Sequence, residues 1–151
     1  MKLLYVGPYT DQSGYATAAR DWICSIHDKI KNLNDIDFKV FDVSYDQTMK
    51  NRNHSAISTI AQYEFASDND CALWCTDNDY MVLFHMTPDS IIRDPRVRMF
   101  LSARKKVAIT AWETTSLPTE WAAILNSYVD AVIIPCAWNK EVFAKSVQKP
   151  I

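Results

Sequence analysis

Five short apolar runs, separated by longer stretches of mixed polarity, constrain the fold of this chain more than any other feature of its sequence. The runs are nearly unbroken rather than alternating, which is the pattern of parallel strands that are buried on both faces. They occupy residues 2–6, 38–43, 80–86, 107–112 and 129–134.

Between the runs, apolar residues recur every three or four positions, which is the spacing of amphipathic helices. Alternating strands and helices predict an α/β fold, a three-layer Rossmann-like domain with a mainly parallel sheet flanked by helices. At 151 residues the chain has the length of one such domain, spanning 1–151, and residues 67–79 are expected to form an irregular loop. Helices are predicted over 13–33, capped by Ser13, and over 55–66, 95–104, 118–128 and 137–147.

The composition argues against several classes of protein. A net charge of −2 gives no general electrostatic attraction to nucleic acid. No apolar run approaches the roughly 20 residues of a membrane span, and the first residues are typical of a strand rather than a signal peptide. We therefore expect a cytoplasmic protein. Its cysteines form no C-x-x-C pair and are expected to be structural thiols rather than a metal or redox centre: Cys24, Cys71, Cys75 and Cys136.

Only two glycines are present, Gly7 and Gly14, and both lie between the first strand and the first helix. A dinucleotide-binding G-x-G-x-x-G needs three glycines and a P-loop needs a lysine after its second glycine, so both motifs are excluded. In an open α/β sheet this loop lies at the carboxyl ends of the strands, where ligands bind. Gly14 then has two interpretations: it lets a phosphate or sugar oxygen approach backbone N–H groups, or it supplies a positive φ in a turn.

Two Asp-x-Asp sequences, at 68–70 and 77–79, match a pattern with which some nucleotide-sugar enzymes hold a divalent metal. Such a motif has to follow a strand so that both carboxylates reach the ion. Here the second copy precedes a strand and the first lies in the expected loop. Turn formation explains both better, and no metal site is predicted.

Six basic residues and a single acid, Asp94, lie within residues 93–106. We interpret this run as the solvent-facing side of a helix that covers the sheet. Contact with the inner face of an anionic membrane is the alternative, and it would use the residues Arg96, Arg98, Arg104 and Lys105.

Three stretches, in this order and spacing, resemble the amino-terminal half of family-four retaining glycosyltransferases of the GT-B fold. S-G-Y-A-x-x-A-R at 13–20 resembles the start of their first helix. A-W-E-T-T-S-L-P-T-E-W at 111–121 is similar to their W-E-x-x-x-x-P-x-x-W segment. D-A-V-I-I-P-C-A-W-N-K-E-V-F at 130–143 is similar to their D-x-x-x-x-P-S-x-W-x-x-x-x-F element, with Cys136 in place of the usual serine.

The resemblance implies a role for five residues. Gly14 and the N–H groups that follow it, including that of Tyr15, would face the diphosphate of the donor. His85 would touch the transferred sugar, as the catalytic residue. Glu113 would point to the acceptor side, and Thr114 would add a hydrogen bond to a hydroxyl, as could Thr115 and Ser116.

Each of these residues also has a plain structural interpretation. His85 can be a partly buried imidazole with satisfied hydrogen bonds. Glu113 can pair with a lysine or cap the helix that begins near Pro118. The tryptophans of the motifs are expected to belong to the core rather than to stack on sugars: Trp112, Trp121 and Trp138.

In the family that the motifs resemble, a second domain carries the nucleotide-sugar pocket, and that domain is expected to lie outside residues 1–151. The chain is therefore expected to be the acceptor-side domain, incomplete alone, with no cofactor or metal beyond the nucleotide-sugar donor. Its expected partners are the donor-binding domain and an acceptor sugar or glycolipid. A non-catalytic module that binds carbohydrate or a protein partner is the alternative. A receiver-like signalling domain is disfavoured, because Asp11 is the only acid in the first loop.

Overall fold

The computed structural model describes residues 1–44 and 54–151 as an α/β fold. The strands are β1 (Lys2–Gly7), β2 (Asp37–Asp42), β3 (Tyr80–His85), β4 (Lys105–Ile109) and β5 (Ala131–Ile133). The longer helices are α1 (Gly14–Ile30) and α6 (Thr119–Tyr128). The shorter ones are α2 (Ser55–Ala61), α3 (Asp68–Trp74), α4 (Pro88–Arg93), α5 (Pro95–Arg98), the 3₁₀ helix η2 (Met99–Ser102) and α7 (Ala137–Phe143).

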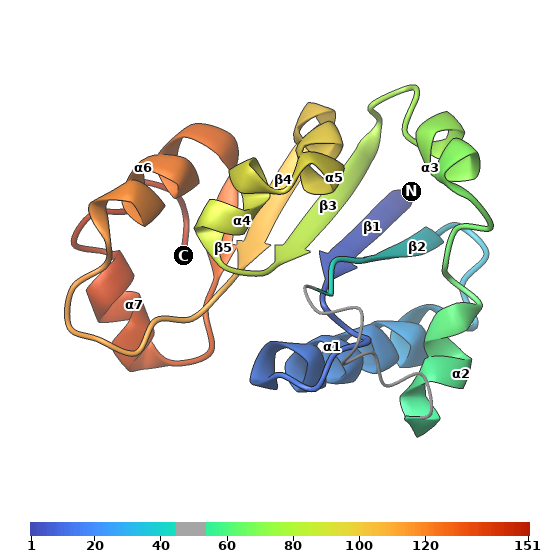
Figure 1. Cartoon of the computed structure of the whole chain (residues 1–151), viewed down its shortest axis with the longest axis horizontal. Coiled ribbons are helices and arrows are strands. Elements are labelled where there is room, and N and C mark those ends of the chain that lie inside the picture. Colours follow the sequence, from blue (N-terminus) through green and yellow to red (C-terminus); the bar gives the residue numbers. More distant parts are fainter. Residues whose placement is uncertain (45–53) are drawn as a thin grey trace.

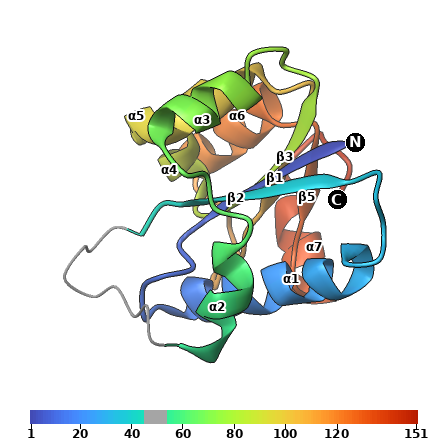
Figure 2. The ribbon, with the colours of Figure 1, turned by 90° about the vertical axis from the view of Figure 1, so that its right-hand side faces the viewer.

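The five strands form one parallel sheet in the order β2-β1-β3-β4-β5. Helices α3, α4, α5 and α6 cover one face, and α1 and α2 cover the other, with α7 on that side beside the edge strand β5 (Figures 1 and 2). This arrangement confirms the predicted three-layer, Rossmann-like fold. None of the helices in the described ranges is long and apolar enough to span a membrane.

Strand β1 explains why the sheet needs apolar residues on both faces. Leu4 and Val6 join the cluster under α3 to α6, whereas Tyr5 joins the cluster under α1 and α2. All three side chains are completely buried. Neighbouring residues of a strand point to opposite faces, so an unbroken apolar run is what two covered faces require.

Helix α1 begins where the sequence predicted. The Ser13 hydroxyl accepts a hydrogen bond from the N–H of Ala16 at 3.1 Å, which is the predicted cap. The helix ends at Ile30, short of the predicted Leu33, which is 50 % exposed. Trp22 is also 37 % exposed, so one side of the predicted apolar stripe does not face the core.

Two segments differ from the prediction in their type of structure, whereas α2, β4 and α7 differ only in their bounds. Residues 67–79 were expected to be irregular, but Ser67 caps α3 there by accepting from the N–H of Asp70. The predicted helix over 95–104 is instead a single turn, α5, followed by the 3₁₀ turn η2, and it is preceded by the unpredicted helix α4. Pro88 and Pro95 cause this division, because each starts a new helix at a position where no N–H donor is needed.

Candidate functional site

A cavity of about 450 Å³ lies at the carboxyl ends of β3, β4 and β5, beside the first half of α1. Four of the five residues to which the sequence analysis gave a role line it: Gly14, Tyr15, His85 and Glu113. The rest of the wall is mostly apolar and consists of Ala18, Trp22, Ile109, Thr110, Ala111, Ile133, Ile134 and Pro135. The volume falls within the range of small-molecule sites, and this end of a parallel sheet is where such sites form.

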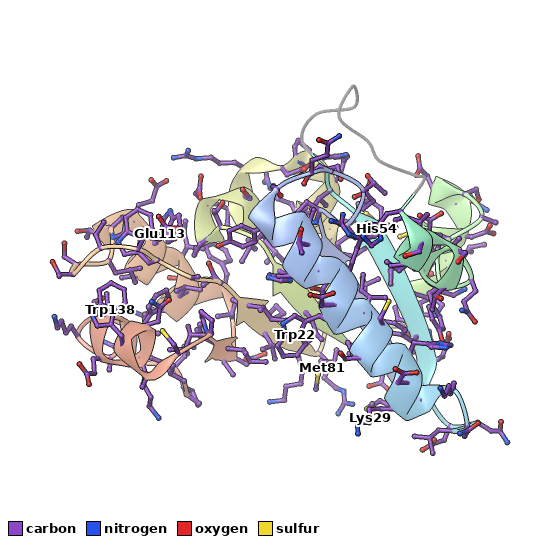
Figure 3. All side chains as sticks on the ribbon, turned by 90° about the horizontal axis from the view of Figure 1, so that it is seen from below. Trp22, Lys29, His54, Met81, Glu113 and Trp138 are labelled. Atoms are coloured by element: carbon purple, nitrogen blue, oxygen red, sulfur yellow. The ribbon has the colours of Figure 1, made fainter. Side chains whose placement is uncertain are left out.

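The cavity lies between α1 and the loops that follow β4 and β5. Figure 3 shows Trp22 on the side of α1 that is turned toward α7, with Glu113 on the loop across from it. Thr114 does not line this cavity but an adjacent one of about 280 Å³. The structure thus places the five candidate residues along one edge of the sheet, and their roles stay predictions.

Gly14 is the first residue of α1, and neither glycine of the chain has a positive φ. The turn interpretation of Gly14 is therefore wrong. A Cβ placed on Gly14 meets no atom within 4 Å, so packing does not require a glycine either. Within the described ranges, the N–H groups of Gly14 and Tyr15 have no hydrogen-bond partner. They leave two donors and the positive end of a helix dipole open to a ligand.

His85 ends β3 and is only 5 % exposed. Its Nδ1 is hydrogen-bonded to the hydroxyl of Tyr5, and that hydroxyl has no other partner in the described residues. The Tyr5 proton is therefore donated to Nδ1, because otherwise a buried hydroxyl would be left without an acceptor. Burial raises the pKa of Tyr5 far above its ordinary value, so that the hydroxyl keeps this proton.

This hydrogen bond fixes the tautomer of His85. With Nδ1 as the acceptor, the neutral ring carries its hydrogen on Nε2, the nitrogen that is left for a ligand in the cavity. Burial lowers the pKa of His85 to about 4, so the ring is neutral at pH 7. In this tautomer the neutral His85 ring carries its N–H on Nε2, and the role of that N–H toward a ligand stays a prediction.

Gly7 makes the contact between Tyr5 and His85 possible. Tyr5 pairs with Leu83 across β1 and β3, so Tyr5 and His85 point to the same face of the sheet. A Cβ on Gly7 would lie 3.0 Å from Cε1 of Tyr5 and 3.2 Å from the carbonyl oxygen of His85. Both distances are tighter than most Cβ contacts in proteins, so a side chain here would displace the Tyr5 ring or the His85 backbone slightly, and the glycine leaves Tyr5 its position against the imidazole.

Tyr15 is held against the cavity wall by the end of β4. Its hydroxyl lies 3.2 Å from the hydroxyl of Thr110 and accepts from the N–H of Ala111 at 3.3 Å. Its ring lies 5.5 Å from the imidazole of His85, centroid to centroid. Tyr15 therefore forms a rigid wall between the helix and the strand ends.

Glu113 forms no hydrogen bond and no ion pair with any described residue, and it is exposed. Neither structural alternative for it is seen in residues 1–44 and 54–151: Glu113 pairs with no lysine of these ranges, and α6 has no side-chain cap at Pro118. Among the described residues that line the cavity, Glu113 alone has a carboxyl side chain. The carboxylate is thus free to accept hydrogen bonds from a ligand.

The loop that carries Glu113 is fixed by the residue before it. The indole N–H of Trp112 reaches the Thr114 hydroxyl and the Ser116 carbonyl, both at 2.7 Å. The buried amide of Asn139 in α7 accepts from the N–H of Trp112 at 3.1 Å and donates to its carbonyl at 2.9 Å. Thr114 is therefore a loop-forming residue as well as a cavity residue.

Sequence reasoning missed the residues that hold the site in place, namely Tyr5, Gly7, Thr110 and Asn139. Tyr5 was part of an apolar strand, and its partner became visible only with the strand register. Thr110 could have been predicted from the sequence, because a polar residue directly after an apolar strand lies at the edge of the sheet where ligands bind. The sequence indicated Asn139 only weakly, by its position beside Trp138 in the third motif.

Of the three tryptophans expected in the core, Trp112 packs against the cluster under α3 to α6, as expected, whereas Trp138 does not. Trp138 is 42 % exposed, and Figure 3 shows it on the outer side of α7. Trp112 and Trp121 are half-buried and pack edge to face, with ring centroids 4.6 Å apart. Both line the 280 Å³ cavity.

The Asp-x-Asp sequences lie away from the site. The first forms the opening turn of α3, not a loop, and the second forms the turn before β3, where Asp77 pairs with Lys2 at 2.9 Å. In residues 1–44 and 54–151, no three His, Cys, Asp or Glu side chains are grouped so as to hold a metal ion. Of the thiols, Cys71 and Cys75 are buried, whereas Cys136 is exposed and provides no side-chain cap for α7.

Most of the basic residues of the 93–106 run are paired. Arg93 bonds to Glu120 at 2.8 Å and Arg104 to Asp79 at 2.6 Å. Arg96 likewise pairs with Asp94, and Lys106 lies 3.9 Å from Asp130. Contact of this run with a membrane stays a prediction.

No protein-family model, no curated protein and no solved structure matches the chain. The resemblance to glycosyltransferases therefore rests on the three sequence motifs, and the cavity is interpreted from its own residues.

Proposed function

We propose that this chain is the acceptor-side domain of a retaining glycosyltransferase of the GT-B type, in which the 450 Å³ cavity faces the reacting sugar. The observation that carries the proposal is the meeting of Gly14, His85 and Glu113 in one cavity at the carboxyl ends of the strands. The three residues come from distant parts of the sequence, and two of them, Gly14 and Glu113, belong to the motifs that resemble the family.

Each group supplies a different kind of contact. The free N–H groups of Gly14 and Tyr15 suit a phosphate oxygen of the donor. The Nε2–H of His85 donates to a sugar oxygen, and the Glu113 carboxylate accepts from an acceptor hydroxyl. The apolar wall around Trp22 excludes water and covers the apolar face of a sugar ring.

In the proposed reaction the acceptor oxygen forms a bond to the anomeric carbon of the donor sugar. The bond between that carbon and the phosphate oxygen breaks, and the nucleoside diphosphate leaves with the electron pair and takes up the hydroxyl proton. The anomeric configuration is retained. A donor-binding domain would supply the remaining contacts to the diphosphate, and the reaction is assigned to the cytoplasm, where thiols stay reduced.

The non-catalytic alternative has one observation in its favour. Trp22 and Ile133, on the cavity wall, are 37 % and 36 % exposed, which also suits a surface that binds a protein partner. The first test is therefore binding itself, by saturation-transfer NMR with a panel of methyl hexosides and sugar nucleotides. Binding of none of these ligands would contradict the proposal.

The variant Gly14→Ala tests whether this glycine is needed for ligand binding or for the fold. Alanine fits the backbone and meets no atom within 4 Å, so the fold should be retained and the free energy of unfolding should rise by about 0.5–1 kcal/mol. Because Gly14 lines the cavity and an added methyl group would stand in open space there, we expect sugar binding to weaken at least about tenfold. Lys29→Ala, at the exposed far end of the same helix (Figure 3), is the matched control and should leave binding unchanged.

The domain alone is expected to transfer no sugar. Hydrolysis of a nucleotide-sugar by the purified chain, clearly above the rate in buffer, would contradict this expectation. The coding DNA beyond residue 151 gives an independent test, since an open frame for a second α/β domain supports the enzyme and a stop codon supports the binding module.

A further inference from the structure

The second cavity, of about 280 Å³, has a floor of two tryptophans and shares one wall with the first. Tyr15, Ala111 and Glu113 line both cavities. The shared residues lie between the two cavities, and one of them, Glu113, has a carboxylate without a partner among the described residues. A single ligand that spans both cavities would contact Glu113 from both sides.

The aromatic floor is held rigidly. The indole N–H of Trp112 is fixed by Thr114 and Ser116, and its backbone is fixed by Asn139. Trp121 packs against the Trp112 ring at an interplanar angle of 62°. A pre-ordered aromatic surface binds a ring with little loss of side-chain entropy.

The polar residues of the second cavity limit the ligand chemistry. Its wall contains the hydroxyl residues Thr87 and Thr114 and one carboxylate, Glu113, and none of the described residues in it is a lysine or an arginine. An anionic ring would therefore meet a negative charge without a cation to balance it. Hydroxyl groups on the edge of a neutral ring match the carboxylate and hydroxyl oxygens, and the apolar face of that ring matches the indoles.

We propose that the cavity floored by Trp112 and Trp121 is a second subsite of the same ligand site. The natural acceptor then contains at least two linked neutral sugar rings, one in each cavity, with the linkage at Glu113. This inference rests on the proposed function and adds to it the class of acceptor, a disaccharide or a longer glycan rather than a single sugar.

The indole N–H resonances of the five tryptophans provide the test, in two-dimensional NMR with methyl hexosides and with the disaccharides built from them. A monosaccharide should shift the resonance of Trp22, which lines only the first cavity. A matching disaccharide should shift Trp22, Trp112 and Trp121 together, leave Trp74 unchanged, and bind about tenfold more tightly than its constituent monosaccharides.

Two variants test whether the tighter binding of the disaccharide comes from the second cavity. Trp121→Leu should remove the tenfold advantage of the disaccharide and leave monosaccharide binding unchanged. Trp138→Leu, which removes an exposed tryptophan outside both cavities, should preserve the advantage. If Trp121→Leu does not fold, Thr87→Val replaces it, with the same expected direction of change.

The possible failures are distinguishable. If sugars bind, disaccharides bind no more tightly than monosaccharides and only Trp22 shifts, the second subsite is wrong and the proposed function stands. If no sugar binds at all, both the proposed function and the second subsite are wrong. A loss of disaccharide affinity in Trp138→Leu equal to that in Trp121→Leu would also overturn the subsite.

Discussion

The buried neutral imidazole of His85 predicts a specific loss of stability in acid. The ring prefers its neutral form in the folded chain, with a pKa of about 4, whereas the unfolded chain binds the proton near the ordinary pKa of 6.5. The unfolded state therefore holds more protons between these two values. The contribution of His85 to stability is fully present above about pH 6.5 and is lost progressively as the pH falls toward 4.

The size of the loss follows from the two pKa values. A difference between 6.5 and about 4, at about 1.4 kcal/mol for each pH unit, corresponds to about 3 kcal/mol. Native proteins are stable by only about 5–15 kcal/mol in total, so this loss is a large fraction of the free energy of unfolding. The value applies to His85 without correction for solvent, because the side chain is only 5 % exposed.

Urea unfolding at pH 7.5 and at pH 4.5, for the wild type and for His85→Gln, measures this effect. Glutamine does not titrate, so the variant should lose less stability than the wild type over the same interval, by about 2–3 kcal/mol. The carboxylates and the other two histidines are present in both proteins, so their effects cancel in the comparison. Tyr5→Phe should leave the pKa low, because burial is its cause, while it releases the tautomer of His85.

Equal pH dependence in the wild type and His85→Gln would contradict this reasoning. So would an imidazole midpoint near 6.5 in an NMR titration of the folded protein. The nitrogen shifts of the same ring report the tautomer, and a hydrogen on Nδ1 in the wild type would refute the assignment of His85 as a donor through Nε2.

Two further substitutions test the parts that hold the site. Gly7→Ala should lower the free energy of unfolding by about 1–3 kcal/mol, because its Cβ would lie 3.2 Å from the carbonyl oxygen of His85; unchanged stability in urea unfolding would be inconsistent with that contact. Asn139→Ala should cost about 1–3 kcal/mol and alter tryptophan fluorescence, because it leaves the N–H and carbonyl of Trp112 unpaired. Asn126→Ala removes a similar but solvent-accessible pair of bonds and should cost less, so an equal loss would refute the argument.

The strands and the sheet type were predictable because the physics involved is local. A short apolar run between turn residues is typical of a strand that is covered on both faces, and Ser13 is a residue type that favours the cap position before a helix. The position of the candidate site was predictable for the same reason. Once the strands are known, the residues that follow them, such as Glu113, must lie at the carboxyl edge of the sheet.

The helices α3 and α4 were not predicted because they are short. Helix α3 has seven residues and begins with Asp68, Asn69 and Asp70, which are residues that favour turns. They are tolerated in the first turn of a helix because its unpaired N–H groups and dipole attract carboxylates. In helices this short, tertiary packing outweighs propensity, and the buried Cys71 supplies that packing here.

The contact between Tyr5 and His85 was beyond sequence reasoning, because it depends on how two distant strands are aligned. The residues are 80 positions apart, and a shift of one residue between β1 and β3 would point one of them to the other face of the sheet. Residue types alone do not fix that register. The tautomer of His85 therefore depends on the register of β1 and β3, which brings the Tyr5 hydroxyl to Nδ1.

The two glycines of the chain are explained by different causes, and the difference bears on function. Neither has a positive φ, so backbone conformation requires neither. Gly7 is required by close packing against Tyr5 and His85, but Gly14 meets nothing. A glycine in a helix costs about 0.5–1 kcal/mol relative to alanine, and no contact within the described fold compensates for this loss at Gly14. We propose that Gly14 leaves space for a ligand at the start of α1. Gly14→Ala is the most direct test of this proposal, because it should raise stability and weaken binding.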